Sequence, residues 1–281
     1  MAMIAIQGET GSFSHEATAR LFPNAEILPC AFSALAFDAV LSGAAEAAVL
    51  PIENSLAGSV LEHYDLLLER PVRIEREMLL RIEHNLIALP GAKLDSLERV
   101  LSHPVALAQC RRFLADHPNI RSTPAYDTAG SVKQIMASRD ERAAAIAPAR
   151  AASVYGAEIL ARNLEDNPQN YTRFLVVRPQ GAAITGAEEA NKASLAFTLP
   201  NRPGALVGAL EVLASLGANL TRLESRPVLG QPWHYVFYVD YHFEGSAMAD
   251  AALAGLTAIC PTVKELGRFP RAASLASPAN I

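Results

Sequence analysis

Short apolar segments alternate with turn residues and helical segments along the first part of the chain. Apolar residues 4–6 lead into the glycine-containing segment 8–14, and residues 15–21 have the Ala and Leu content of a helix. The same order recurs, with strands predicted at 26–28 and 47–50 and helices predicted at 33–41 and 58–68. This alternation predicts a doubly wound parallel sheet, in which ligands bind beyond the carboxyl ends of the strands.

A second α/β lobe follows. Charged and apolar residues alternate over 76–89 as in a strand, and further elements are predicted at 104–115, 120–123, 128–136, 143–147 and 171–177. We expect a first domain over 1–178, with one lobe at about 1–76 and 160–178 and the other at about 77–159. The alternative is one continuous sheet. Two lobes would leave a cleft between them, where ligands commonly bind.

The segment 179–192 interrupts this periodicity with Gly, Pro and small residues, as linkers do. Residues 193–281 then form a compact pattern of strand, helix, two strands, helix and strand, predicted at 194–199, 205–216, 219–226, 233–243, 247–259 and 263–268. This β-α-β-β-α-β order is typical of a ferredoxin-like domain.

Composition narrows the class of protein. The 281 residues are 51% hydrophobic and 19% charged, so a folded chain is expected. The net charge of −5 and the absence of long Lys/Arg runs argue against a nucleic-acid partner. No apolar run reaches about eighteen residues and no signal peptide is evident, so we expect a cytoplasmic protein without a membrane partner.

Familiar catalytic motifs are missing from the sequence. Cys30, Cys110 and Cys260 are too far apart for a disulfide framework or a zinc cluster, and they are predicted to be buried thiols. Neither H-E-x-x-H nor G-x-S-x-G occurs. A reaction that uses hydroxyls, amides and a shaped pocket is therefore favoured over one that needs a metal or a strong nucleophile.

Polar residues gather in four segments where predicted strands end or helices begin. In the first, glycines permit a tight turn after the strand, and Ser12 with the amides that follow can receive an anion. In the second, Glu53, Asn54 and Ser55 follow a buried strand; the alternative is that Asn54 or Ser55 only caps the next helix.

In the third segment, Pro104 suits the first turn of a helix, with Ser102 near its N-cap and Gln109 about two turns further on. A capping Ser and a surface Gln are the alternative. In the fourth, the period of a strand sends Thr172 and Phe174 to one face and Arg173 to the other. Thr172 by itself is also an ordinary strand residue.

Seven segments in register carry a resemblance that covers nearly the whole chain. They are GETGSFSHEA at 8–17, PIENSLAGSV at 51–60, SHPVALAQCR at 102–111, DTAGSV at 127–132, NYTRFLVV at 170–177, GALV at 204–207 and NLTRLESRP at 219–227. Together they resemble the prephenate dehydratase family with a C-terminal ACT regulatory domain. The resemblance implies a two-lobed fold like that of periplasmic binding proteins, and conversion of prephenate to phenylpyruvate in phenylalanine biosynthesis without a cofactor.

The resemblance also implies site residues. Thr172 matches the family's catalytic threonine, and we expect it to donate a hydrogen bond to the leaving hydroxyl or to relay its proton. Helix starts near Ser12, Ser55 and Ser102 are expected to bind the substrate carboxylates. Phe174 would keep the pocket dry, and Arg173 either contacts substrate or forms a supporting salt bridge. The substrate-binding set is Ser12, Asn54, Ser55, Ser102, Gln109, Thr128, Arg173 and Phe174.

For the C-terminal domain, the resemblance implies that phenylalanine binds at a subunit interface and inhibits the enzyme. The residues implied are Asn201, Gly204, Ala205, Leu206, Val207, Asn219, Leu220, Glu224, Ser225 and Arg226. The alternative is a structural turn at Gly204 with a surface ion pair of Glu224 and Arg226. A homodimer or homotetramer is expected from the family.

Two other functions stay open at this point. An arogenate dehydratase would perform the same elimination on a substrate that carries an amino group, and a non-catalytic two-lobed sensor would only bind a carboxylate or amino acid. The chain begins at the first strand, so we expect a monofunctional enzyme without a chorismate mutase domain. His63 departs from the small hydroxyl residue expected there in many relatives.

Overall fold

The computed structural model describes residues 1–183, 187–228, 230 and 233–273. The chain divides into two compact units, Met1–Tyr64 with Met78–Leu175, and Asp65–Glu77 with Val176–Ile281. Parts of the predicted linker and of the C-terminal domain, at 184–186, 229, 231–232 and 274–281, lie outside the described residues.

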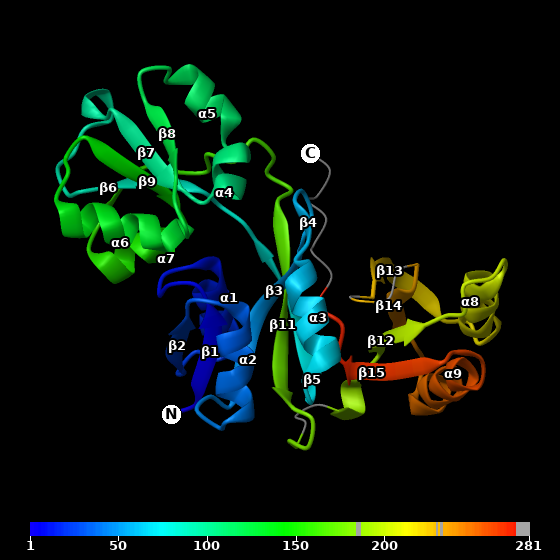
Figure 1. The fold of residues 1–281 in the computed structure, drawn as a ribbon. Coiled ribbons are helices and arrows are strands. Elements are labelled where there is room, and N and C mark those ends of the chain that lie inside the picture. Colours follow the sequence, from blue (N-terminus) through cyan, green and yellow to red (C-terminus); the bar gives the residue numbers. More distant parts are fainter. Residues whose placement is uncertain (184–186, 229, 231–232, 274–281) are drawn as a thin grey trace. The chain divides into compact units, whose positions relative to one another are not determined.

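The first sheet has the strand order β2-β1-β3-β11-β5, with the short β4 paired to β3. Its strands are β1 (Met3–Gln7), β2 (Glu26–Cys30), β3 (Ala47–Asn54), β4 (Gly58–Ser59), β5 (Val72–Arg81) and β11 (Tyr171–Pro179). β1 pairs in parallel with both β2 and β3, as the sequence predicted. Helices α1 (Phe13–Leu21) and α2 (Ser33–Leu41) connect these strands (Figure 1).

One predicted boundary in this sheet is wrong. The strand predicted at 47–50 continues to Asn54, and Glu53 and Asn54 pair with Ser59 and Gly58 of β4. Helix α3 (Leu61–Glu69) therefore begins after this small hairpin rather than at 58. Because residues 53 and 54 are extended, neither Asn54 nor Ser55 caps a helix.

A second, separate sheet has the order β10-β6-β9-β7-β8, so the alternative of one continuous sheet is excluded. Its strands are β6 (Asn85–Ala88), β7 (Arg99–Ser102), β8 (Arg121–Pro124), β9 (Ala143–Ala147) and β10 (Glu158–Ala161). It is mixed, because β6 runs antiparallel to both β9 and β10, while β7 is parallel to β8 and β9. A short 3-10 helix, Leu94–Ser96, precedes β7.

The apolar residues of β9 alternate between the two faces of this sheet. Ala144 and Ile146 pack in one core with Phe113, whereas Ala143, Ala145 and Ala147 pack in another with residues of α6 and α7. Helices α4 (Pro104–Ala108) and α5 (Arg111–Asp116) thus lie over one face, and α6 (Thr128–Ser138) and α7 (Ala149–Tyr155) over the other (Figure 1).

The helix predicted at 104–115 is interrupted. α4 ends at Ala108 with Gln109 as its C-cap, and Cys110 leaves the helical region with φ −123° and ψ 37° before α5 begins. His103, not Ser102, is the N-cap of α4. Gln109 ends α4, whereas Ser102 ends β7, so the two residues do not lie on one face of a helix.

The second unit contains a four-stranded antiparallel sheet of order β13-β14-β12-β15. Its elements are β12 (Lys192–Thr198), α8 (Ala205–Ser215), β13 (Asn219–Pro227), β14 (Tyr235–His242), α9 (Ser246–Ile259) and β15 (Thr262–Phe269), after a 3-10 turn at Ala187–Glu189. The predicted ferredoxin-like order is confirmed. Its core contains Leu195, Phe197, Leu213, Tyr241 and Leu256.

Residues 65–77 belong to this second unit and contact its sheet. The Lys264 ammonium donates to the backbone carbonyls of Leu67, Leu68 and Arg70, which end α3, at 2.8–2.9 Å. Gly267 approaches Ile74 so closely that a Cβ there would lie 2.3 Å from the Ile74 carbonyl oxygen. The division into a catalytic domain, linker and regulatory domain at 178 and 193 stays a prediction.

Candidate active site

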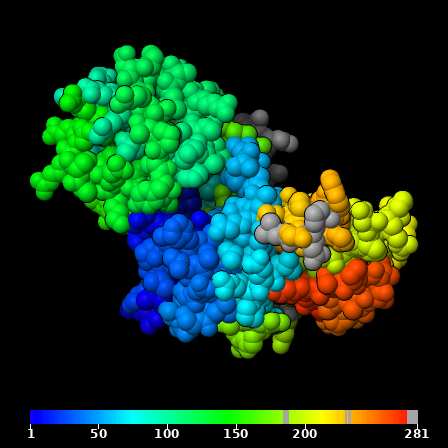
Figure 2. Space-filling view, in the orientation of Figure 1, coloured from blue at the N-terminus to red at the C-terminus, as the bar shows by residue number. Residues whose placement is uncertain are grey.

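A cavity of about 1020 Å³ lies within the first unit, lined by residues that follow strands of both sheets. The two parts of this unit, blue to cyan and green in Figure 2, meet along a furrow. Six of the predicted site residues line the cavity: Ser12, Asn54, Gln109, Thr128, Thr172 and Phe174. The structure therefore brings together side chains that lie up to 162 positions apart in the sequence, Ser12 and Phe174 being the extremes.

Asn54, at the end of β3, is held in one amide orientation by the backbone. Its Oδ1 accepts hydrogen bonds from the amides of Leu56 at 3.0 Å and Ala57 at 2.8 Å. Its Nδ2 must then point the other way, where it donates to Thr172 Oγ1 at 3.0 Å and to Asn170 Oδ1 at 2.8 Å. Backbone amides thus fix which atom faces Thr172.

The fixed orientation of Asn54 also determines the amide orientations of Asn170 and Gln109. Asn170 turns its Oδ1 toward Asn54, so its Nδ2 donates to Gln109 Oε1 at 2.9 Å. Gln109 Nε2 donates back to Asn54 Oδ1 at 3.3 Å, and Gln109 Oε1 also lies 2.9 Å from His84 Nε2. Because that oxygen can only accept, the imidazole carries its proton on Nε2. Residues of β3, β11, α4 and the start of β6 form one network.

Strand alternation at β11 works as predicted. Thr172 and Phe174 line the cavity, whereas Arg173 does not and is buried on the other face. Thr172 Oγ1 accepts from Asn54, and in the described part of the chain no contact takes the hydrogen of the Thr172 hydroxyl. That hydroxyl is therefore able to donate to a ligand in the cavity.

Helix α1 presents its N-terminus to the cavity through Ser12, Phe13 and Ser14. Ser12 is the N-cap, and its Oγ accepts a 3.4 Å contact from the amide of His15. The N-terminus of α6 is different, because Asp127 caps it by accepting from Gly130 at 2.7 Å. Thr128 is the first residue of α6 and lines the cavity beside this carboxylate.

Charged groups cluster near that end of the cavity. Glu9 accepts from Tyr126 and from Lys133, each at 2.9 Å. Burial, and then the nearby Glu9 charge, raise the pKa of Asp127 above its ordinary value. The only lysine or arginine among the lining residues of this cavity, Lys133, is thus already paired with Glu9.

Besides Arg173, two predicted site residues, Ser55 and Ser102, do not line this cavity. The Ser55 hydroxyl donates to the Gln169 carbonyl at 3.1 Å and accepts from the Tyr171 amide at 3.0 Å, so it joins β3 to β11. Ser102 is fully buried at the end of β7, and its hydroxyl donates to the Ile146 carbonyl at 2.6 Å. The expected helix start near Ser55 is wrong, because Ser55 follows β3 and α3 begins only at Leu61. The helix start near Ser102 is confirmed, since Ser102 directly precedes His103, the N-cap of α4, but its hydroxyl faces the Ile146 carbonyl.

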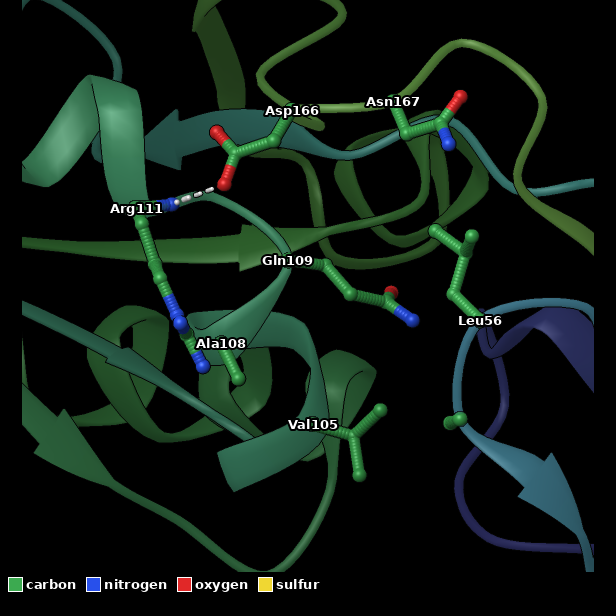
Figure 3. Close-up of a pocket in the computed structure, with 8 residues that line it drawn as sticks. Leu56, Val105, Ala108, Gln109, Arg111, Asp166 and Asn167 are labelled. Atoms are coloured by element: carbon green, nitrogen blue, oxygen red, sulfur yellow. Dashed lines mark hydrogen bonds between the residues drawn. The ribbon is translucent and has the colours of Figure 1, made fainter.

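A smaller cavity of about 310 Å³ shares Gln109 and Val105 with the larger one. Figure 3 shows Leu56 and the α4 side chains reaching into it from opposite sides, with the Gln109 amide between them. Asp166 accepts from the backbone amide of Arg111 at 3.0 Å and thereby holds the start of α5. Gln109 is thus accessible from two cavities.

His63 is buried against β3, where its Nε2 lies 2.8 Å from the Ser33 hydroxyl and its Nδ1 contacts the Pro51 carbonyl. A hydroxyl beside an imidazole is the arrangement of a nucleophile and its base. Both side chains are about 1% exposed, however, and neither lines the described cavities. The pair therefore packs the first lobe rather than meeting a substrate.

The sequence analysis did not select three residues of this site: His84, Asn170 and Asp127. Asn170 stands two positions before Thr172, at the start of the NYTRFLVV segment, which was a usable signal. Asp127 was visible as a capping residue before a helix. His84 gave no local signal, because its partner Gln109 is 25 positions away.

Other predictions concern groups outside the cavity. The three cysteines are free and buried, as expected. Among the residues that the structure describes, no group of three His, Cys, Asp or Glu side chains is placed to hold a metal ion. No helix in the described ranges is long and apolar enough to span a membrane.

In the second unit, Gly204 caps α8 with φ +78°, followed by Ala205, Leu206 and Val207 in the first turn. Asn219, Leu220 and Ser225 lie on β13, which is an edge strand. Glu224 accepts from Arg222 at 2.8 Å, and Arg226 donates to Asp65 at 2.5 Å. Asn201 lies in the turn before α8.

Known proteins resemble this chain over nearly its full length. Residues 4–182 match the family model for prephenate dehydratase. The chain is 39% identical over 277 residues to arogenate dehydratase/prephenate dehydratase 2, chloroplastic, of Arabidopsis thaliana, covering 95% of this chain and 72% of that protein. The chain therefore belongs to the prephenate dehydratase family.

Two solved structures share the fold at 36% sequence identity. One is described as prephenate dehydratase from Arthrobacter aurescens in complex with L-Phe, with a TM-score of 0.86 over 96% of this chain and 90% of that one. The other is described as GqqA, a novel type of quorum quenching acylase, with a TM-score of 0.87 over 98% of both chains.

Proposed function

We propose that this protein catalyses the decarboxylating dehydration of prephenate to phenylpyruvate. The observation that carries the proposal is the state of Thr172, whose oxygen accepts from Asn54 while its hydrogen remains available to the cavity. A threonine hydroxyl is too weak an acid to release its proton outright. It serves instead as a hydrogen-bond donor to the departing hydroxyl, or as a relay between that hydroxyl and a proton source.

The balance of the reaction fits such a site. The ring C–O bond breaks and its electron pair leaves on oxygen, while the electron pair of the C–C bond to the ring carboxylate enters the ring and carbon dioxide departs. The leaving oxygen takes up one proton and becomes water. Aromatisation drives the reaction, so the protein needs to position the substrate and stabilise negative charge on the leaving oxygen.

Uncharged donors are available to bind the carboxylates. The N-terminus of α1 directs amide N–H groups toward the cavity from Phe13 and Ser14, and its end of the helix dipole is positive. Phe174 adds an apolar wall beside Thr172, which strengthens hydrogen bonds by lowering the local dielectric. Gln109 supplies a further amide at the cavity surface.

Arogenate is the second candidate substrate, and the carboxyl groups at one end of the cavity favour it. Arogenate carries an ammonium where prephenate carries a keto group, and Glu9 and Asp127 place two carboxyl groups at one end of the cavity. The Arabidopsis relative is also named for both activities. An acylase reaction has less support, because the Ser33 hydroxyl beside His63 is buried.

Parallel assays of the purified protein with prephenate and arogenate test the proposal. We expect phenylpyruvate from prephenate with a kcat/KM at least tenfold above the value for arogenate. A reversed ratio would make the protein an arogenate dehydratase, and no turnover of either substrate would contradict the proposed function.

We further propose that L-phenylalanine binds the second unit and inhibits turnover. The support is the relative described in complex with L-Phe, together with the turn at Gly204, where α8 begins without a side-chain cap. Amides of the first turn of α8 can receive the amino-acid carboxylate. Titration calorimetry at millimolar L-phenylalanine should show binding to the whole protein, and D-phenylalanine serves as the matched control. Absence of heat with the L-isomer would contradict this role.

A further inference from the structure

His84 is a buried imidazole directly behind the proposed reaction site. Its side chain is 2% exposed and lines the main cavity between Phe13 and Gln109. The backbone holds it firmly, since its amide donates to Glu165 Oε2 at 2.9 Å and its carbonyl accepts from Leu164 at 2.8 Å. Its ring meets Phe13 edge-on, with ring centroids 5.5 Å apart.

The two ring nitrogens of His84 differ in their hydrogen bonding. Nε2–H donates to Gln109 Oε1, which already accepts from Asn170. Nδ1 is buried and has no hydrogen-bond partner among the described residues. An unpartnered buried nitrogen costs free energy, and half of the hydrogen-bonding capacity of this imidazole is unused within the described residues.

What this histidine secures is the direction of the Gln109 amide. With two donors on Oε1, Gln109 must turn its Nε2 toward Asn54. Asn54 Oδ1 accepts from the amides of Leu56 and Ala57 and, as a third donor, from Gln109 Nε2, so the Nδ2 of Asn54 faces Thr172. The imidazole thus completes a chain of oriented amides that ends on the threonine oxygen.

We propose that His84 is a positioning residue for the reaction: it fixes Gln109, whose Nε2 adds a third donor to Asn54 Oδ1 and so holds more firmly the Asn54 orientation that leaves the Thr172 hydroxyl hydrogen for the substrate. The proposal rests on the proposed function of the cavity. His84 has no contact with reacting atoms in this account and exchanges no proton with the substrate. Its contribution is orientation, which raises kcat more than it lowers KM.

A matched pair of variants separates this role from simple packing. In His84→Gln the amide nitrogen can take the place of Nε2, whereas in His84→Asn it can reach only the place of Nδ1, too far from Gln109. We expect H84Q to retain kcat within about threefold of wild type, and H84N to lose about tenfold or more with KM changed less than threefold. Rescue by Gln but not by Asn is not expected of a residue that only fills space.

A double-mutant cycle supplies the second readout. If His84 acts through Gln109, then H84N should lower kcat less than twofold in a Gln109→Leu background, because there is no amide left to orient. Folding of each variant is checked by its thermal midpoint, and H84Q remains informative even if H84N unfolds more easily.

The outcomes separate a failure of the proposed function from a failure of the positioning role of His84. Wild-type protein that turns over neither substrate contradicts the proposed function. Active wild-type protein with a normal kcat in H84N, or with equal tenfold losses from H84N in both backgrounds, overturns the positioning role of His84.

Discussion

Asn54 Nδ2 donates a hydrogen bond to Thr172 Oγ1 across 3.0 Å, joining the end of β3 to the start of β11. The two residues are 118 positions apart in the sequence. A hydroxyl that accepts from a fixed amide has its own hydrogen left for another acceptor. This relationship leaves the Thr172 hydroxyl hydrogen free to donate toward the cavity, and a variant that reverses the direction of the hydrogen bond should remove that donor.

Asn54→Asp tests the direction of this hydrogen bond with almost no change in shape. The retained Oδ1 still accepts from Leu56 and Ala57, but the second oxygen replaces the amide donor. Thr172 would then donate to that carboxylate and turn its hydrogen away from the substrate. We expect kcat to fall about a hundredfold, the loss typical for removal of one transition-state donor, and the thermal midpoint to fall as well, because the new oxygen also faces Asn170 Oδ1 and the Tyr171 carbonyl. A normal kcat in N54D would show that the orientation of Thr172 is irrelevant.

Gly8 is required by the backbone and by a neighbour. Its φ is +92°, and a Cβ would lie 2.8 Å from Asp127 Oδ2. Gly91 is the matched control, because its φ is +84° and nothing lies within 4 Å of the position of a Cβ. We expect G8A to lower the free energy of unfolding in urea by about 1–2 kcal/mol more than G91A does. Both variants force alanine into a positive φ, but only the new Cβ of G8A meets a carboxylate. Equal costs would contradict this contact.

The buried Lys192 ammonium donates to both carboxylate oxygens of Glu77, at 2.9 and 3.1 Å, within the second unit. Lys192→Met removes the cation and leaves the carboxylate buried, which should cost about 3 kcal/mol or more of unfolding free energy. The exposed pair of Arg142 and Glu98 is the control, and R142M should cost less than about 1 kcal/mol. Similar losses of unfolding free energy from K192M and R142M would contradict the larger effect that we expect for the buried pair.

Two buried imidazoles make stability depend on pH. Burial lowers the pKa values of His63 and His84. The opposing hydrogen bonds to the Pro51 carbonyl and to Gln109, and the smaller effects of Glu62 and Glu165, do not reverse this. The unfolded chain binds these protons below a pKa of about 6.5, while the folded chain does not. The stability is therefore fully present above about pH 6.5 and is lost as pH falls toward the folded pKa values.

Urea unfolding between pH 5 and 8 measures this dependence. Each histidine contributes a slope of up to about 1.4 kcal/mol per pH unit within the window. H84Q should remove one of the two contributions. A slope that is the same in wild type and H84Q would show that His84 does not titrate in this way.

Local sequence pattern predicted most of the fold. Helix 33–41 and the alternation of Thr172, Arg173 and Phe174 were correct, because each depends on the periodicity of neighbouring residues. The start of α3 was missed because Glu53 and Asn54 pair with β4, a contact that no helical or strand period encodes. The elements α7 and β10 were also not predicted, since residues 149–161 carry no distinct pattern.

The site was less predictable than the fold. Asn54, Gln109 and Thr172 were selected through resemblance, and the structure shows why they belong together. Ser55 lies in the same motif as Asn54, and Ser102 in the same motif as Gln109. The hydroxyls of both serines nevertheless bond to backbone groups. His84 joins the network only through a distant partner. Such roles depend on tertiary contacts, which a single sequence does not display.

The central claim is that the Thr172 hydroxyl donates to the leaving group of prephenate. Its most direct measurement is the kcat for phenylpyruvate formation by Thr172→Ala and Thr172→Ser, compared with wild type. We predict a loss of about a hundredfold or more for T172A and recovery of most of the activity in T172S, which keeps the hydroxyl. A folded T172A variant with near-normal kcat would contradict the account.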